Sequence, residues 1–76
     1  MRRDPNDEND VCLAFGRRLR ALRLERGLSQ EELGERASLH RTYISDIEGG
    51  TRNVSLRNIH KLAAALGVSD AELMGR

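Results

Sequence analysis

Arg41, Thr42 and Ser45 are the residues whose types and spacing best suggest a chemistry. At 100° per residue in a helix, all three lie on one polar face with Asp46, and the opposite face is apolar. A guanidinium can donate two hydrogen bonds to guanine, and a threonine methyl can pack on the methyl of thymine. This face could therefore read base edges in DNA, although an ordinary amphipathic surface helix has the same pattern.

The residues before this face help to choose between these interpretations. Ser29 and Glu32 form an S-x-x-E capping box, and Leu28 and Leu33 stand at the positions of a hydrophobic staple, so two signals start a helix here. Residues 37–39 interrupt its pattern, and a new helix is expected from a cap at position 40. Two short helices around a tight turn are typical of a helix-turn-helix, whose second helix enters the major groove.

Cap residues and apolar periodicity predict three further helices. The first should run from an N-cap at Asp10 to a stop at Gly27, and a later helix from a cap at Ser55 to a stop at Gly67. A second capping box starts a last turn near residue 69. The apolar stripe of the first helix should comprise Cys12, Phe15, Leu19 and Leu22. That of the later one should comprise Leu56, Ile59, Leu62, Ala63 and Leu66.

The composition bounds the class of protein. With 76 residues, 38% hydrophobic and only 3% aromatic, the chain can form one small domain, and helices are favoured over a sheet. The prediction is an all-α fold, a compact five-helix bundle over residues 10–76 behind a flexible polar arm at residues 1–9. The formal net charge is only +1, but five arginines gather in the first helix: Arg17, Arg18, Arg20, Arg23 and Arg26. They fit either phosphate contacts or a solvated face.

Several functional classes are not expected. Cys12 is the only cysteine, which excludes a disulfide within the chain and a thiolate zinc site. Neither an apolar run of roughly 20 residues nor a secretory signal is present, so a cytoplasmic protein is expected. His40 and His60 are the only histidines, and no nucleophile has an evident base partner, so we expect no enzyme, no cofactor and no metal site.

Residues 15–74 resemble the lambda-repressor-like DNA-binding domain of phage repressors, Cro proteins and the Xre family of bacterial regulators. The matching segments are RLRALR (18–23), GLSQEEL (27–33), YISDIE (43–48) and LAAALGVS (62–69). Residues 40–48 followed by Arg52 and Asn53 are most similar to the controller proteins of restriction-modification systems. The family usually has glycine where Ser38 stands and alanine where Gly34 stands, so Ser38 is expected in a left-handed conformation.

The resemblance implies roles for individual residues. It places Arg41, Thr42 and Ser45 at base-reading positions, where Asp46 either accepts from a cytosine amino group or, as we favour, holds a neighbouring side chain. Contacts to backbone phosphate are implied for Gln30, Arg52 and Asn53, and the hydroxyl of Tyr43 could also reach a phosphate. Alternatively, Gln30 is an exposed helix former, Tyr43 belongs mainly to the edge of the core, and residues 52–53 form a plain loop. The resemblance also implies a structural salt bridge between Arg23 and Glu48.

The predicted function is a sequence-specific transcriptional regulator. One recognition helix reads too few bases to select a site, so we expect a homodimer on a pseudo-palindromic operator, with RNA polymerase as a further candidate partner. The expected dimer surface comprises Leu66, Val68, Leu73 and Met74, although Leu66 and Val68 could equally belong to the core of one chain. The alternative is an antitoxin-like protein-interaction module whose DNA binding is secondary. No small-molecule or membrane partner is indicated.

Overall fold

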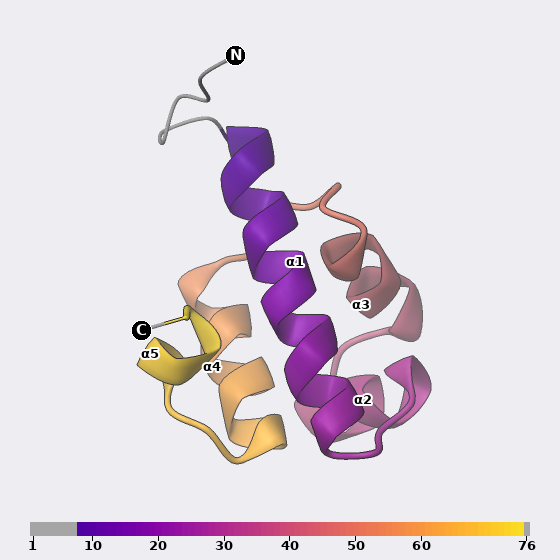
Figure 1. Cartoon of the computed structure of the whole chain (residues 1–76). Helices are drawn as coiled ribbons and strands as arrows, with labels where there is room; N and C mark the ends of the chain where they lie inside the picture. Colours follow the sequence, from indigo (N-terminus) through magenta and orange to yellow (C-terminus); the bar gives the residue numbers. More distant parts are fainter. Residues whose placement is uncertain (1–7, 76) are drawn as a thin grey trace.

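The computed structural model describes residues 8–75, with side chains from residue 11 onward. Over that range it contains five helices and no strand: α1 (Glu8–Glu25), α2 (Gln30–Ala37), α3 (Arg41–Glu48), α4 (Leu56–Leu66) and α5 (Asp70–Leu73). The long helix α1 runs across the molecule, with α2 and α3 on one side of it and α4 and α5 on the other (Figure 1). The predicted all-α, five-helix fold is confirmed. None of the helices in the described range is long and apolar enough to cross a membrane.

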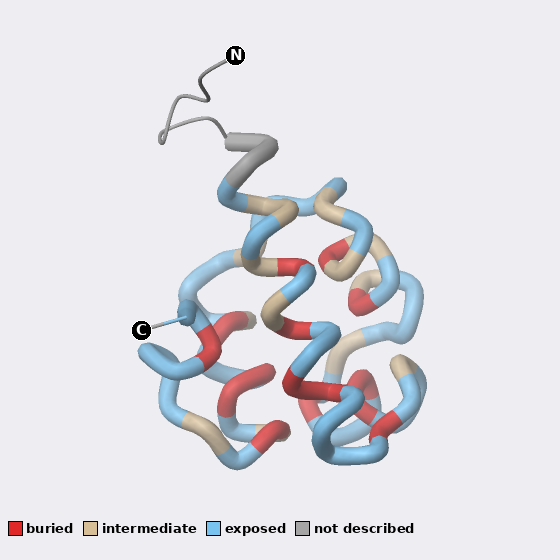
Figure 2. The backbone as a smooth tube through the Cα atoms, in the orientation of Figure 1, coloured by how far each residue is buried: buried red, intermediate tan, exposed pale blue. Residues whose placement is uncertain are grey.

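All five helices contribute to one hydrophobic core (Figure 2). The largest fully buried side chains come from every helix, and they are Leu19, Leu33, Ile44, Ile47, Leu62 and Leu73. Each such side chain stabilises the fold by about 1.5–3 kcal/mol relative to an exposed position. Because α3 contributes two of these side chains from its inner face, the core fixes which side of that helix faces outward.

The helix ends follow the cap signals, with one exception at the start of α1. Gly27 and Gly67 have φ angles of 66° and 72°, the left-handed conformation expected of a stop. Ser55 caps α4, its hydroxyl accepting from the N–H of Asn58. However, α1 begins at Glu8, so Asp10 lies within its first turn and the prediction of an N-cap there is wrong. An acidic residue is favoured in the first turn as well as at the cap, so its type alone does not choose the position. Of the arm predicted over residues 1–9, residues 8–9 belong to α1 and residues 1–7 lie outside the described range.

The apolar stripe of α4 is correct except at its first position. Ile59, Leu62, Ala63 and Leu66 are buried, but Leu56 is 83% exposed. Leu56 directly follows the cap, in a first turn that lies at the edge of the core. Periodicity gives the direction of its side chain, but it does not show whether another element of the fold covers that side chain.

The predicted dimer surface is wrong in part, because the core of the chain uses some of its residues. Leu66 and Leu73 are 3% and 0% exposed, and Val68 packs against the core as a half-buried side chain. Met74 is 50% exposed. Only Met74 of the four is therefore freely available to a partner.

Two arginines of the cluster, Arg18 in α1 and Arg26 in the turn that follows it, make contacts within the molecule. Arg18 donates two hydrogen bonds to the carbonyl oxygen of Glu72, at 3.1 and 3.0 Å. Arg26 donates to the carbonyl of Leu66 at 3.0 Å. Both acceptors lie in the last turns of their helices, where carbonyls lack partners within the helix and attract cations. Arg18 therefore connects α5 to α1, and Arg26 connects α4 to the turn that follows α1.

Candidate DNA-binding surface

The turn between α2 and α3 sets the position of the recognition helix. Ser38 ends α2 with φ 58° and ψ 42°, the left-handed conformation that the sequence predicted. The N–H of Leu39 then donates to the carbonyl of Gly34 at 2.8 Å. A Cβ atom on Gly34 would lie 2.5 Å from the carbonyl oxygen of Leu39, so the missing side chain lets the turn lie close against α2.

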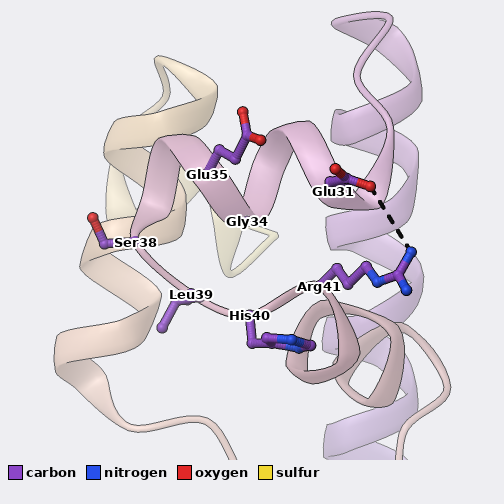
Figure 3. Close-up of a pocket in the computed structure, with 7 residues that line it drawn as sticks. All are labelled: Glu31, Gly34, Glu35, Ser38, Leu39, His40 and Arg41. Atoms are coloured by element: carbon purple, nitrogen blue, oxygen red, sulfur yellow. Dashed lines mark ion pairs between the residues drawn. The ribbon is translucent and has the colours of Figure 1, made fainter.

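His40 caps α3, although serine, threonine, aspartate and asparagine are the usual residues at such a position. Its Nδ1 accepts a hydrogen bond from the N–H of Thr42 at 3.0 Å, and its backbone is extended, with φ −69° and ψ 143°. The imidazole therefore satisfies one of the free N–H groups at the start of the helix. As a result α3 begins at Arg41, at the rim of the hollow between α2 and α3 (Figure 3).

The outer face of α3 carries the three predicted base-reading side chains. Arg41, Thr42 and Ser45 are exposed, whereas Ile44 and Ile47 on the inner face are buried. These positions agree with the polar and apolar faces assigned from helical periodicity.

Arg41 makes one weak ion pair. Its Nη1 atom lies 3.8 Å from an oxygen of Glu31 on α2 (Figure 3), and the two side chains are 68% and 65% exposed. A pair this exposed contributes about 0–1 kcal/mol. The guanidinium can therefore leave Glu31 for a better acceptor, such as a guanine edge, at little cost.

Beside this face lies a connected cluster of four side chains, those of Asp46, Arg52, Tyr43 and Asn58. Arg52 Nε donates to Asp46 Oδ2 at 3.3 Å, and the guanidinium carbon lies 5.4 Å from the centre of the Tyr43 ring. The hydroxyl of Tyr43 accepts from the side-chain amide of Asn58 at 3.0 Å. Asp46 thus holds a neighbouring side chain, as favoured from the sequence. The part of Asn58 could not be found from the sequence, because 15 residues separate it from Tyr43.

The loop that follows α3 is fastened at two points. The Thr51 hydroxyl donates to the backbone carbonyl of Asp46 at 3.1 Å, and the Cys12 thiol donates to Asn53 Oδ1 at 3.5 Å. These contacts hold the predicted phosphate-binding residues Arg52 and Asn53 near the C-terminal end of α3.

Arg23 and Glu48 form the predicted ion pair between α1 and α3. Arg23 donates to both oxygens of Glu48, at 2.7 and 2.9 Å, and to the carbonyl of Leu28 at 2.8 Å. The two side chains are only 8% and 4% exposed. The hydrogen bond to Glu48 raises the pKa of the Arg23 guanidinium, against the opposing effect of burial.

Gln30 joins this pair, which the sequence did not predict. Its side-chain nitrogen donates to Glu48 Oε1 at 3.1 Å, and the residue is half-buried. The amide carries two hydrogens, so one remains for a further acceptor. Gln30 therefore connects the first residue of α2 with the end of α3.

The start of α2 is fixed by the predicted capping box. The Ser29 hydroxyl accepts from the N–H of Glu32 at 3.0 Å, and Glu32 Oε1 accepts from the N–H of Ser29 at 2.9 Å. These hydrogen bonds from Ser29 lower the pKa of the Glu32 carboxyl. The N–H groups at the beginning of α2 are therefore held in place next to Gln30, where an anion could approach them.

The model of the family described as helix-turn-helix domain matches residues 14–74. The chain belongs to this family. Helix-turn-helix proteins of this kind are DNA-binding transcriptional regulators, and α2 with α3 forms the motif here.

Similar helix-turn-helix proteins include several controllers. Over 67 residues the chain is 54% identical to control protein C.BamHI of Bacillus amyloliquefaciens, covering 87% of this chain and 83% of that protein. The crystal structure of the restriction-modification controller protein C.AhdI from Aeromonas hydrophila has a TM-score of 0.86 and 48% identity, covering 90% of this chain and 99% of that one. The controller C.Esp1396I, solved as a tetramer in complex with its natural 35 base-pair operator, has a TM-score of 0.79 and 32% identity, with 86% of each chain covered.

Proposed function

We propose that this regulator is the controller of a restriction-modification system and binds a pseudo-palindromic operator as a homodimer. The observation that carries the proposal is the outer face of α3, where Arg41, Thr42 and Ser45 are exposed while Ile44 and Ile47 anchor the helix. The major groove of B-DNA is about 12 Å wide and admits such a helix. The similar controllers support the narrower role.

The proposed contacts divide into two kinds. Arg41, Thr42 and Ser45 read base edges, with Arg41 placed to donate two hydrogen bonds to a guanine. Gln30, Tyr43, Arg52 and Asn53 contact the phosphate backbone on both sides of α3 and set its register. Asp46 reads no base in this scheme, because its carboxylate is engaged by Arg52.

The homodimer follows from the small number of bases that one helix can read. An α-helix of eight residues is about 12 Å long, so only a few base pairs lie within its reach. Two copies on half-sites one helical turn apart double the sequence that is read. The operator complex of the similar controller C.Esp1396I, in which the protein is a tetramer, supports assembly of more than one copy.

The proposal gives the chain a binding role and no catalytic one. It acts in the cytoplasm, where bacterial DNA lies, and it changes transcription by meeting or excluding RNA polymerase at the operator. A regulator of this kind responds to its own concentration through the monomer–dimer equilibrium.

Selection of bound sites from a random pool of duplex DNA tests this function. We expect a pseudo-palindromic consensus whose half-site centres lie about 10 base pairs, or a multiple of that, apart. Titration of the selected duplex against a scrambled duplex should then show specific binding tighter by about 10³-fold or more. Equal affinity for the two duplexes would overturn the proposal.

A further inference from the structure

Asn58, in the first turn of α4, makes a side-chain contact with the recognition helix. Its Nδ2 atom donates to the hydroxyl oxygen of Tyr43 at 3.0 Å, across 15 residues of the chain. Both residues are half-buried, and Tyr43 packs against the hydrophobic core. The backbone N–H of Asn58 donates to the hydroxyl of Ser55 at 3.1 Å, so the cap of α4 holds the residue that carries the amide. The contact is therefore a defined link between α4 and α3.

This link determines the direction in which the hydroxyl of Tyr43 can donate. A phenolic hydroxyl carries a single hydrogen and can both donate and accept, whereas an amide nitrogen only donates. The hydroxyl therefore accepts on the side of Asn58, and its own hydrogen points elsewhere. Among the residues that the structure describes, no group accepts that hydrogen. Tyr43 thus presents a free donor beside the outer face of α3.

Arg52 lies next to this donor and adds a positive charge to the same place. Its guanidinium carbon is 5.4 Å from the centre of the Tyr43 ring, and its Nε atom donates to Asp46. The terminal nitrogens of the guanidinium are left for another acceptor. A phosphate group has several acceptor oxygens, so one phosphate can accept from both the guanidinium and the hydroxyl.

We propose that Asn58 is a positioning residue for DNA binding, whose amide holds the Tyr43 hydroxyl so that it donates to a backbone phosphate of the operator. The inference rests on the proposed function, and it adds a residue of α4 to a surface otherwise made by α2, α3 and the loop after α3. Asn58 touches no DNA in this scheme. It acts by orienting the hydroxyl before DNA arrives, and a group that is oriented in advance loses less freedom on binding.

Asn58→Asp reverses this hydrogen bond and is the central test. A carboxylate only accepts, so the Tyr43 hydroxyl would donate to the new carboxylate instead of to the phosphate. The helix should remain intact, because position 58 is the third of α4 and an acidic side chain is favoured in a first turn. We expect binding to the selected operator to weaken by about 10-fold or more, which corresponds to one lost hydrogen bond to a charged group. Base preference should not change, since a phosphate contact reads no base.

Asn58→Ala separates the orienting role from simple packing. It removes the amide without adding an acceptor, so the Tyr43 hydroxyl can still donate to a phosphate, and the loss of affinity should be only about 3-fold. If Asn58 served only to hold α4 against α3, alanine would weaken binding at least as much as aspartate, and the inference would be wrong. Urea denaturation of both variants shows whether either change in affinity follows from a loss of stability.

Tyr43→Phe removes the hydroxyl, and Ser55→Asp is the matched control for charge. Ser55→Asp adds the same charge to the start of α4 and keeps a favoured cap residue there. Fluorescence-anisotropy titrations of the selected duplex measure the single and double variants. The effects of Asn58→Asp and Tyr43→Phe should be coupled by about 10-fold, whereas those of Ser55→Asp and Tyr43→Phe should be independent.

Two results in these titrations would overturn the role of Asn58. One is independence of Asn58→Asp and Tyr43→Phe, and the other is a Tyr43→Phe variant that binds as tightly as the wild type, because the hydroxyl would then donate to no phosphate. In both cases a wild type that prefers the selected duplex to the scrambled one still has the proposed function. Equal affinity of the wild type for the two duplexes would show that the proposed function is itself wrong, and the role of Asn58 would fail with it.

Discussion

Arg41 and Arg52 are two exposed arginines near opposite ends of α3, and their different surroundings suit them to different contacts with DNA. Arg41 makes one long ion pair with an exposed glutamate, so its planar group can turn toward a base edge. Arg52 is held between the carboxylate of Asp46 and the ring of Tyr43. A cation in a fixed place suits a phosphate, which requires charge at the right position rather than a readable pattern.

Arg41→Ala should relax base preference at one position in each half-site by about 1–3 kcal/mol and leave the fold intact. Arg52→Ala should instead weaken binding to all sequences and reduce the slope of log K against log salt by about one unit. Titrations of operator variants, each at several salt concentrations, measure both effects. Identical behaviour of the two variants across the operator series would show that this division of labour is wrong.

Asp46→Ala separates positioning from base reading. If Asp46 acts by holding Arg52, its loss should weaken binding without changing base preference, and the double variant with Arg52→Ala should bind no more weakly than Arg52→Ala alone. A double-mutant cycle on the selected operator measures the coupling, for which we expect about 0.5–1 kcal/mol between partly exposed partners. A change of preference at a single base pair would instead identify Asp46 as a base reader.

At the scale of single elements, the sequence predicts most of what the structure contains, because helix ends depend on local signals. The capping box of Ser29 and Glu32 and the stops at Gly27 and Gly67 each involve residues within a few positions of one another. The left-handed conformation of Ser38 was expected from the resemblance, because the family usually has glycine at this position. These signals fix α2 and α3, and with them the direction of the exposed face.

Ser38→Gly should stabilise the protein by about 0.5–1 kcal/mol. A left-handed conformation costs an L-residue about 1–2 kcal/mol, and glycine avoids this cost. Part of the resulting stabilisation is lost because glycine is more flexible in the unfolded chain. Gly67→Ala is the matched control, because its φ is 72° and nothing lies within 4 Å of the added Cβ, so it should destabilise by about 1–2 kcal/mol. Urea denaturation measures both. Destabilisation by Ser38→Gly would mean that the serine side chain, rather than its backbone angle, matters at the turn.

Glu48→Ala should destabilise the protein by about 3–5 kcal/mol, because it leaves the buried guanidinium of Arg23 without its partner. The same change removes the acceptor of Gln30 and so loosens the junction of α1, α2 and α3. Glu31→Ala is the control, since Glu31 is 65% exposed and its loss should change the free energy of unfolding by about 0.5 kcal/mol or less. Similar losses in the two variants would contradict a structural role for the buried pair.

At the scale of the whole molecule, the sequence predicts less, because the decisive contacts join distant residues. The hydrogen bonds of Arg18 and Arg26 span 54 and 40 residues along the chain. Two arginines that suggest a basic face in the sequence therefore hold α5 and α4 in place. The exposure of Leu56 depends likewise on what other elements leave uncovered. Periodicity indicates which residues are apolar together, but it cannot divide them between the core of one chain and an interface between two.

The dimensions of the molecule suit adjacent half-sites. Its extents are 38 × 24 × 22 Å, so the centres of two touching copies are separated by 22 to 38 Å, depending on which faces meet. This range includes the 34–36 Å that separates successive major grooves on one side of DNA. A rigid pair would then engage both half-sites at once, and the second contact would be effectively intramolecular.

Binding should therefore depend on the spacing of the half-sites. Removal of one half-site should weaken binding by about 100-fold or more, because the avidity of the second contact is lost. Insertion of about five base pairs between intact half-sites should have nearly the same effect, since it turns one of them to the opposite side of the duplex. Gel-shift titrations of the three duplexes measure this, with a substitution of the central base pairs at unchanged spacing as the control. If the protein bound the lengthened duplex as tightly as the duplex with natural spacing, the two copies would be binding their half-sites independently. The protein would then not bind as a rigid dimer.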